Sequence, residues 1–482
     1  MLIRTIFFVP FISLLFYRTI NFKSYFILNS VVFIYLLVFL IKSRPGFLFK
    51  LPSSYKYLFA AIFISLLSYL LSPVKEIISL EYINFISGFI IYFLVINIDE
   101  KLDFKYTYPF IIALLSLGIY DSFINSGVDV ASVLKNSNTL AFILIMLIGI
   151  LISEKKYYFS IFLFAALIAT KSIAAMLSIM SVSFYYGFKN RKNIDIKNNS
   201  VILVIMIILF GFLIYNIDTN SIYDRLRWWK VCLRMHYLSP IFGWGYSSFA
   251  YTADCFISDG LRSSYAHNYF LETLVENGII FSALWFYFLY LSVKSANGFL
   301  KYSLIAALIH SFFDFGINTS CGWWFFMFFL GISAKDNMLV FRLGDEYSKY
   351  KKYLVSFALI LLISWFFLGF RYFNIEKINN ELISLNNLKS YDTALGISQK
   401  ALEKYPSSID IALRRIEILE GIYAEKKDTV NLEMLARSIE YSLLLNPYYK
   451  AGYKKLESIY KYLGDYKSLD ELKNREKKYI YK

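Results

Sequence analysis

Four residues near the middle of the chain could bind a phosphate group and contact a sugar. Arg225 and Arg227 are followed directly by Trp228 and Trp229. The planar guanidinium of arginine matches pairs of phosphate oxygens, and a tryptophan ring suits a sugar face or the membrane–water interface. This segment is therefore a candidate anion-binding site, and the alternative is a basic amphipathic helix that rests on lipid headgroups.

A histidine followed by three regularly spaced polar residues could move a proton. His267 precedes Asn268, Glu272 and Glu276, which step by four residues and so share one face of a helix. Histidine exchanges protons near neutral pH, which suits it to act as a general base. The alternative is a structural histidine at the protein surface.

A second histidine stands close to an aspartate inside an apolar stretch. His310 and Asp314 are one helical turn apart, so we expect them to face the same way and to hydrogen-bond or share a proton. Ionisable residues inside a membrane are functional candidates, because placing them there is energetically costly. The alternative is a polar pair that satisfies itself and packs helices together.

Metal binding is not indicated by the cysteines. Cys232, Cys255 and Cys321 lack a CxxC spacing and are accompanied by only three histidines, so we expect no Cys/His metal site. Cys232 and Cys255 fall in one segment, 218–276, where oxidation is possible. A disulfide between these two cysteines is left open.

The composition places these candidate residues in a membrane protein. The 482 residues are 58% apolar and 18% charged, whereas soluble proteins are about 45–50% apolar and about 25% charged. A bilayer core about 30 Å thick is crossed by about 20 apolar helical residues. We therefore predict an all-α, polytopic fold of about 12–13 transmembrane helices, in which 157–170 and 172–188 could be one tilted helix. The predicted spans lie near residues 3–19, 24–42, 56–73, 79–97, 108–125, 138–153, 157–170, 172–188, 199–217, 277–294, 299–316, 321–334 and 353–372.

The distribution of basic residues predicts how the spans are oriented. With the N-terminus inside, alternate short loops hold 20 Lys and Arg residues on the cytoplasmic side and five on the other side. This excess predicts a cytoplasmic N-terminus, an outward C-terminal tail and a large outer loop, 218–276. The N-terminal apolar stretch lacks a small-residue cleavage site, so we expect it to remain as the first helix. The net charge of +15 then requires no nucleic-acid partner.

The chain divides into a membrane domain, 1–372, and a helical tail, 373–482. The tail contains residues at the offsets of the second helix of a tetratricopeptide repeat, where small side chains let paired helices pack closely. These residues are Tyr391, Ala394, Ala401 and Pro406. Looser copies follow, so we predict two to three degenerate repeats. The tail is expected to bind a protein partner or, alternatively, to act as a helical cap that steadies the membrane domain.

Together these motifs resemble the bacterial O-antigen ligase and polymerase superfamily, which also includes O-oligosaccharyltransferases. The resemblance covers roughly residues 136–320 and rests on the order and spacing of five motifs. They are Asn136-Ser137-Asn138-Thr139-Leu140-Ala141, Arg225-Leu226-Arg227-Trp228-Trp229, Pro240-Ile241-Phe242-Gly243-Trp244-Gly245, His267-Asn268-x-x-Leu271-Glu272-x-x-x-Glu276-Asn277-Gly278 and His310-Ser311-x-x-Asp314. The chain departs from the family at Thr170-Lys171-Ser172, where members often have Ser-Arg-Gly.

The resemblance implies transfer of a glycan from an undecaprenyl diphosphate carrier to an acceptor hydroxyl, at the outer face of the bacterial inner membrane. It implies that Arg225 and Arg227 bind the donor diphosphate, with Lys171 in place of the missing arginine. His267 would activate the acceptor hydroxyl, and Asp314 would orient it or bind the acceptor. No metal or cofactor is implied, and direct attack would invert the anomeric centre. The residues expected to support this site are Asn268, Glu272, Glu276 and His310.

Several functions stay open within and outside this superfamily. Ligation to a lipid A-core sugar is the first prediction, and the alternatives are polymerisation of the glycan itself and transfer to a protein hydroxyl. A polysaccharide or lipid-carrier transporter belongs to another class, but the two halves of the chain show no convincing internal repeat. A third possibility is an assembly protein that recruits partners through its tail.

Overall fold

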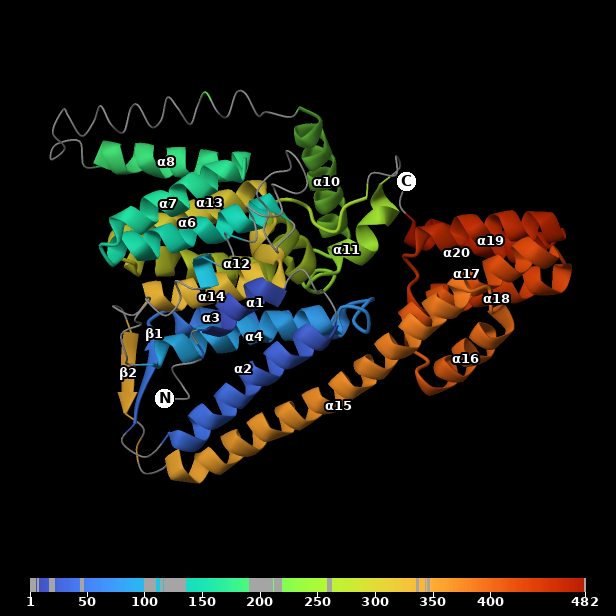
Figure 1. Cartoon of the computed structure of the whole chain (residues 1–482), viewed down its shortest axis with the longest axis horizontal. Helices are drawn as coiled ribbons and strands as arrows, with labels where there is room; N and C mark the ends of the chain where they lie inside the picture. The colour runs from blue at the N-terminus through green and yellow to red at the C-terminus, as the bar shows by residue number, and fades with distance from the viewer. Residues whose placement is uncertain are drawn as a thin grey trace.

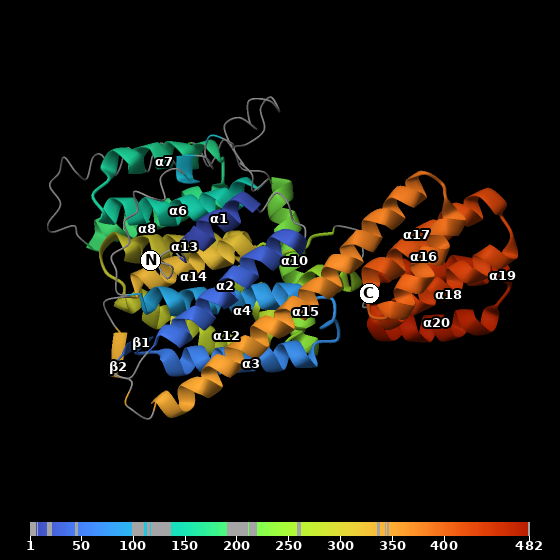
Figure 2. The ribbon, with the colours of Figure 1, turned by 60° about the horizontal axis from the view of Figure 1, so that its bottom comes forward.

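The computed structural model is mostly helical, with a bundle of apolar helices joined to a helical tail by one long helix, α15 (Figure 1). A second view shows the tail projecting from one end of the bundle (Figure 2). The structure describes residues 6, 8–16, 22–43, 47–98, 110–112, 116, 136–189, 211, 219–257, 262–334, 338–342, 344 and 347–480. The predicted spans near 108–125 and 199–217 lie almost entirely outside the described residues.

The other predicted spans coincide with helices. In the described part of the chain, α4, α12 and most of α15 are long and apolar enough to cross a membrane, and further apolar helices are shorter. Two separate helices, α7 and α8, replace the single tilted helix considered as the alternative. The chain is thus a predominantly α-helical membrane protein. The helices of the bundle are α1 (Phe8–Phe16), α2 (Phe22–Lys42), α3 (Tyr55–Leu71), α4 (Ser79–Ile96), α6 (Ser137–Ser153), α7 (Tyr157–Ala169), α8 (Ile173–Lys189), α12 (Tyr269–Ser295), α13 (Gly298–Phe313) and α14 (Ser320–Ser333).

One element departs from the predicted all-α fold. Strands β1 (Leu48–Pro52) and β2 (Met338–Arg342) form a two-stranded antiparallel ribbon, in which Phe49 is paired with Phe341. Each strand is too short to give a periodic signal of its own, and the two meet only because the bundle brings their loops together. Both loops belong to the set that was predicted to be cytoplasmic.

Helix α15 (Tyr347–Asn387) connects the membrane domain to the tail without a break. It extends well beyond the predicted span 353–372, because no proline separates its apolar part from the polar part that follows. Its apolar part packs along α2, where the Trp365 indole nitrogen donates to Ser30 Oγ at 3.0 Å. The predicted boundary at 372/373 therefore falls inside a continuous helix.

The tail consists of five helices that pack in chain order after α15 (Figures 1 and 2). Ala394 and Ala401, the small residues of the predicted repeat, are buried. Their classification as tetratricopeptide repeats stays a prediction. The helices are α16 (Tyr391–Lys404), α17 (Ile409–Lys426), α18 (Thr429–Leu445), α19 (Lys450–Leu463) and α20 (Tyr466–Tyr479).

The tail shares a hydrophobic core with the outer segment, which is the described part of the predicted outer loop 218–276. The rings of Trp244 and Tyr448 meet at a centroid distance of 5.4 Å. The Lys450 ammonium donates to the carbonyl oxygen of Asp254 at 3.2 Å and also to that of Ile257. The turn between α18 and α19 thus packs against the outer segment and hydrogen-bonds to its backbone.

Candidate active site

Helix α10 (Thr219–Leu238) carries the predicted arginines and turns one of its faces toward the start of α12. Arg225, Trp228 and Trp229 follow the i, i+3, i+4 spacing of one helix face. The Trp229 indole nitrogen on this face donates to the carbonyl oxygen of Ala266 at 3.1 Å. Arg227 lies two residues from Arg225, on a different face, and is exposed. The two predicted diphosphate-binding arginines therefore point in different directions.

The start of α12 presents the predicted base, His267. Asn268 caps the helix, because its side-chain oxygen accepts from the backbone nitrogen of Leu271 at 3.0 Å. His267 itself has a φ of +52°, in the left-handed region that non-glycine residues seldom adopt. The chain thus turns sharply before the helix begins, and such strained residues are frequent at functional sites.

Two motifs that are separate in the sequence form one structural unit. Helix α12 is interrupted at Gly278, which has a φ of 75° and a ψ of 176°. The segment Pro240–Gly245 docks on this interruption, and a side chain at Gly278 would overlap the carbonyl group of Ile241. The backbone hydrogen bonds between them run from Ile279 N to Pro240 O at 2.9 Å, from Trp244 N to Val275 O at 3.0 Å and from Gly245 N to Glu276 O at 2.7 Å.

Two buried glutamates of α12 hold the outer segment in place. Glu272 accepts from the backbone nitrogen of Ala266 at 2.6 Å, directly before His267. Glu276 accepts from the backbone nitrogen of Phe249 at 3.2 Å. Each side chain thus holds the backbone of a neighbouring loop, and a supporting role in the site stays a prediction.

The carboxylate of Asp314 is the point where distant segments of the chain converge. Asp314 is fully buried and follows directly on the last residue of α13. Its Oδ2 accepts from the side-chain nitrogen of Asn138 at 2.7 Å and lies 3.4 Å from Arg225 Nη2 and 3.5 Å from His267 Nδ1. Its Oδ1 accepts from the backbone nitrogen of Phe315 at 2.8 Å. The structure thus brings together Arg225, His267 and Asp314, which were predicted from three separate motifs.

The predicted pairing of the His310 and Asp314 side chains is wrong. Helix α13 ends at Phe313, and Asp314 has an extended backbone with a φ of −151° and a ψ of 170°. The two side chains therefore no longer share a helix face. The His310 ring is buried near Phe142, and among the described residues neither of its nitrogens has a hydrogen-bond partner.

Aromatic rings fix the orientation of the His267 imidazole. The Trp228 ring stacks on it at a centroid distance of 4.9 Å and an angle of 16°, and the Phe315 ring meets it edge-on at 4.6 Å and 89°. His267 Nδ1 faces the Asp314 carboxylate at 3.5 Å, and a proton on Nδ1 would leave Nε2 free to accept another. A histidine held in this way by a carboxylate can act as a general base.

Arg225 retains hydrogen-bonding capacity for an anion. Its side chain is 19% exposed, and with the described residues it forms one ion pair, the 3.4 Å contact with Asp314. In the part of the chain that the structure describes, its Nε is buried without a hydrogen-bond partner. An anionic group in reach of the guanidinium would therefore improve the local hydrogen bonding.

Lys171 lies at the same end of the bundle as Asp314. It occupies the exposed turn between α7 and α8, with a φ of 53°. The last turn of α8 contacts the start of α13, where the rings of Tyr186 and Tyr302 are 5.2 Å apart. Because α8 thus runs antiparallel to α13, its first turn reaches the end of α13. Neither Lys171 nor Arg227 contacts the Asp314 carboxylate.

Two residues of the site had no role assigned from the sequence. Asn138 belongs to a motif that was recognised as the start of a helix, but its contact with Asp314 depends on the packing of α6 against α13. Phe315, which contacts the His267 ring, belongs to no motif. The place of Asn138 in the Asn-rich motif could have indicated a role in the site. For Phe315 the sequence offers only its position next to Asp314.

The three cysteines are buried free thiols, and the disulfide left open for Cys232 and Cys255 is not formed. The Cys255 thiol donates to the carbonyl oxygen of Tyr448 at 2.9 Å. Burial, together with the neighbouring Asp254 carboxylate, raises the pKa of Cys255 to about 12. Cys255 thus belongs to the contact between the outer segment and the tail.

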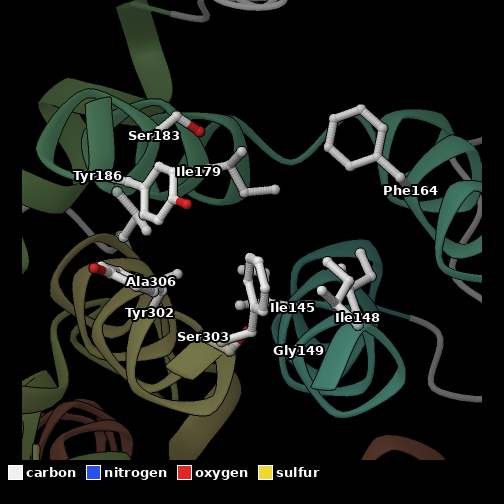
Figure 3. A pocket seen from close by; sticks show the side chains of 13 residues that line it. Ile145, Ile148, Gly149, Phe164, Ile179, Ser183, Tyr186, Tyr302, Ser303 and Ala306 are labelled. Carbon is white, nitrogen blue, oxygen red and sulfur yellow. The ribbon is translucent and has the colours of Figure 1, made fainter. Parts of the chain in front are cut away.

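An apolar groove of about 520 Å³ runs between α12 and α13 toward the site. Phe312 lines its end and contacts the Trp229 ring at a centroid distance of 6.1 Å. A second apolar cavity, of about 320 Å³, lies among α6, α7, α8 and α13 (Figure 3). Ile145, Ile179 and Tyr302 are among its lining residues, and it includes none of the predicted site residues.

Comparison with known proteins supports the resemblance seen in the sequence. A family model described as O-antigen ligase matches residues 133–286, which include Asn138, Arg225 and His267 but end before Asp314. No curated protein and no solved structure matches the chain. The family match supports a relationship of this chain to the O-antigen ligase superfamily. It also supports a membrane glycosyltransferase activity of the ligase or polymerase type.

Proposed function

We propose that this protein is an O-antigen ligase-type glycosyltransferase, which moves a glycan from undecaprenyl diphosphate to the hydroxyl of a lipid A-core sugar. The observation that carries this proposal is the contact of one buried carboxylate, Asp314, with both His267 and Arg225. A base and a cation beside each other are what glycosyl transfer from a diphosphate requires, because a proton is removed and a negative charge develops.

The proposed reaction is a single displacement. His267 Nε2 removes the proton from the acceptor hydroxyl, and the oxygen attacks the anomeric carbon of the donor sugar. The bond between that carbon and the diphosphate oxygen breaks, and the diphosphate leaves with the electron pair. Asp314 stabilises the imidazolium formed on His267, and attack from the side opposite the leaving group inverts the anomeric centre.

Arg225 is proposed to stabilise the departing diphosphate. Its guanidinium is partly exposed, and its buried Nε lacks a partner among the described residues. A planar cation can bind two phosphate oxygens at once. Arg227 and Lys171 are proposed to act farther from the reacting carbon, since neither contacts Asp314.

The apolar groove between α12 and α13 supports a lipid-linked donor. It is lined almost entirely by apolar side chains, including Phe270, Leu308 and Phe312. Its end at Phe312 adjoins Trp229 of α10, the helix that carries Arg225. A polyprenyl chain in this groove would therefore bring its diphosphate close to Arg225. The site is proposed to face the outer side of the bacterial inner membrane, with the N-terminus in the cytoplasm and the tail in the periplasm.

Reconstitution with a lipid-linked oligosaccharide tests this function. Purified protein would be incubated with the donor and, separately, with lipid A-core, with a Ser/Thr peptide and with no added acceptor. Glycan on lipid A-core supports the ligase. Longer glycans without added acceptor would identify a polymerase, and a glycosylated peptide would identify an O-oligosaccharyltransferase.

Two variants test the assigned residues within the same assay. His267→Gln should lose transfer, whereas His236→Gln, which replaces another histidine of the outer segment, should retain it. Arg225→Ala should raise the apparent KM for the donor and lower kcat, because the guanidinium both binds the diphosphate and stabilises the charge that develops on it. Normal transfer by correctly inserted His267→Gln protein would refute the base assignment.

A further inference from the structure

A groove on the tail has the features of a second binding site. It has a volume of about 410 Å³ and lies across α16, α17 and α18. The tail helices alone form it, and a ligand bound there takes no part in the reaction proposed above. Its lining combines cationic and apolar side chains, among them Leu402, Arg415, Met434, Arg437 and Tyr441.

Arg415 is the central cation of this groove. Its side chain is half-buried, and Nη1 donates to two uncharged oxygens, Ser398 Oγ at 3.1 Å and Leu395 O at 3.4 Å. Among the described residues no carboxylate lies within ion-pair distance of it. Burial without a compensating anion lowers the pKa of Arg415. An immobilised, partly desolvated guanidinium without a counter-charge favours binding of an anion.

The other charges of the groove leave it cationic. Arg437 is a second cation whose ion pair with Glu433 spans 3.7 Å between side chains that are 82% and 56% exposed. Such exposed pairs contribute little energy. Glu403 is the one acidic lining residue, and its carboxylate is exposed and accepts a hydrogen bond from Gln399 at 3.1 Å.

We propose that the tail groove binds an acidic peptide segment of a partner protein, with a carboxylate held between Arg415 and Arg437. The apolar part of the lining favours a peptide over a phosphorylated glycan. Leu402, Met434 and Tyr441 offer a surface for a hydrophobic side chain beside the carboxylate, and methionine adapts its shape to such partners. A glycan would require a denser set of polar groups than these three residues supply.

The position of the groove links a bound partner to the membrane domain. Met434, Arg437 and Tyr441 all belong to α18, which ends at Leu445. Shortly after this end, the Tyr448 ring contacts Trp244 of the outer segment. A partner in the groove would therefore be bound to α18, whose following turn contacts the outer segment.

Peptide selection on the full-length protein tests the proposal. Short random peptides would be displayed and selected on purified protein in detergent micelles, and the affinities of the selected peptides would be measured by fluorescence anisotropy. We expect the peptides to be enriched in Asp and Glu, to bind more weakly as salt increases and to lose binding when their acids become amides. A selection without acidic enrichment, or without any binder, would overturn the proposal.

Three charge variants locate the binding site. Arg415→Gln and Arg437→Gln should each weaken peptide binding about 10-fold, the effect of losing one charge-assisted hydrogen bond. Lys400→Gln removes a cation from α16 outside the groove and should change the affinity less than about twofold. Arg437 is largely exposed, so its replacement preserves the fold even if Arg415→Gln lowers the melting temperature. Unchanged binding by Arg437→Gln would overturn the proposal, and so would displacement of the peptide by inorganic phosphate as effectively as by free acidic peptide.

Discussion

Asn138 of α6 and Asp314 at the end of α13 are joined by a side-chain hydrogen bond of 2.7 Å. The oxygen that accepts this bond, Oδ2, also faces Arg225 Nη2 and His267 Nδ1. The contact from Asn138 is much the shortest of the three. Asn138 therefore fixes the carboxylate within the helix bundle, while the residues of the outer segment approach the same oxygen from α10 and from the start of α12.

Replacement of Asn138 should slow the reaction without weakening donor binding. Asn138→Ala removes a hydrogen bond to a charged group, worth about 1.5–3 kcal/mol, and should lower kcat about 10-fold or more. Asn138→Asp should lower kcat further than Asn138→Ala does, because it places a second carboxylate against Asp314. Steady-state kinetics with purified lipid-linked donor would measure both, with Ser137→Ala as the control. A raised donor KM with unchanged kcat would contradict this positioning role.

Replacements of Asp314 and of His310, which lie one turn apart at the end of α13, should differ in their effect on activity. Asp314→Asn keeps the shape of the side chain but removes the charge that stabilises the His267 imidazolium, so kcat should fall about 10²-fold to 10⁴-fold. His310→Phe should retain most of the activity, because the His310 ring packs near Phe142 without hydrogen bonds to described residues. Transfer assays on correctly inserted protein would measure both losses. Equal losses in Asp314→Asn and His310→Phe would contradict the different positions of the two side chains.

Local features of the site could be predicted from the sequence because they depend on helix periodicity. The spacing of Arg225, Trp228 and Trp229 places them on one face of α10, and the four-residue steps of Asn268, Glu272 and Glu276 place them along the start of α12. The separation of Arg227 from this face follows from the same periodicity. Residue type alone suggests that Arg227 binds the diphosphate together with Arg225, but helix geometry places the two side chains on different faces.

Contacts between distant segments could not be derived from the sequence. The pairing of His267 with Asp314 requires the start of α12 to lie beside the end of α13, and no local pattern specifies that packing. The expected pairing of His310 with Asp314 failed for a local reason, since the helix ends at Phe313. The ribbon of β1 and β2 was missed because its short strands are brought together only by the bundle.

Gly278 should be essential for the fold of the outer segment. Gly278→Ala adds a methyl group that overlaps the Ile241 carbonyl, in a backbone conformation with a φ of 75°. We expect a loss of about 3 kcal/mol in the free energy of unfolding, from strain and overlap together. Gly298→Ala is the matched control, because Gly298 also has a positive φ but has open space around it, so about 1 kcal/mol is expected. Thermal unfolding in detergent would compare the two variants, and equal shifts would show that the docking of Pro240–Gly245 does not constrain Gly278.

The Cys255 thiol should report on the contact between the outer segment and the tail. Its pKa of about 12 leaves only about one thiol in 10⁴ ionised at pH 8, and thiolate is the reactive form. Alkylation of the intact protein should therefore be slow, and its mass should be the same with and without reductant because the cysteines are free. Tyr448→Ala removes the ring that packs against Trp244 and should speed alkylation of Cys255, whereas Tyr466→Ala, at an exposed tail position, should leave the rate unchanged. Mass spectrometry of the alkylated peptides would measure these rates, and rapid labelling of Cys255 in the wild-type protein would mean that the tail does not cover it.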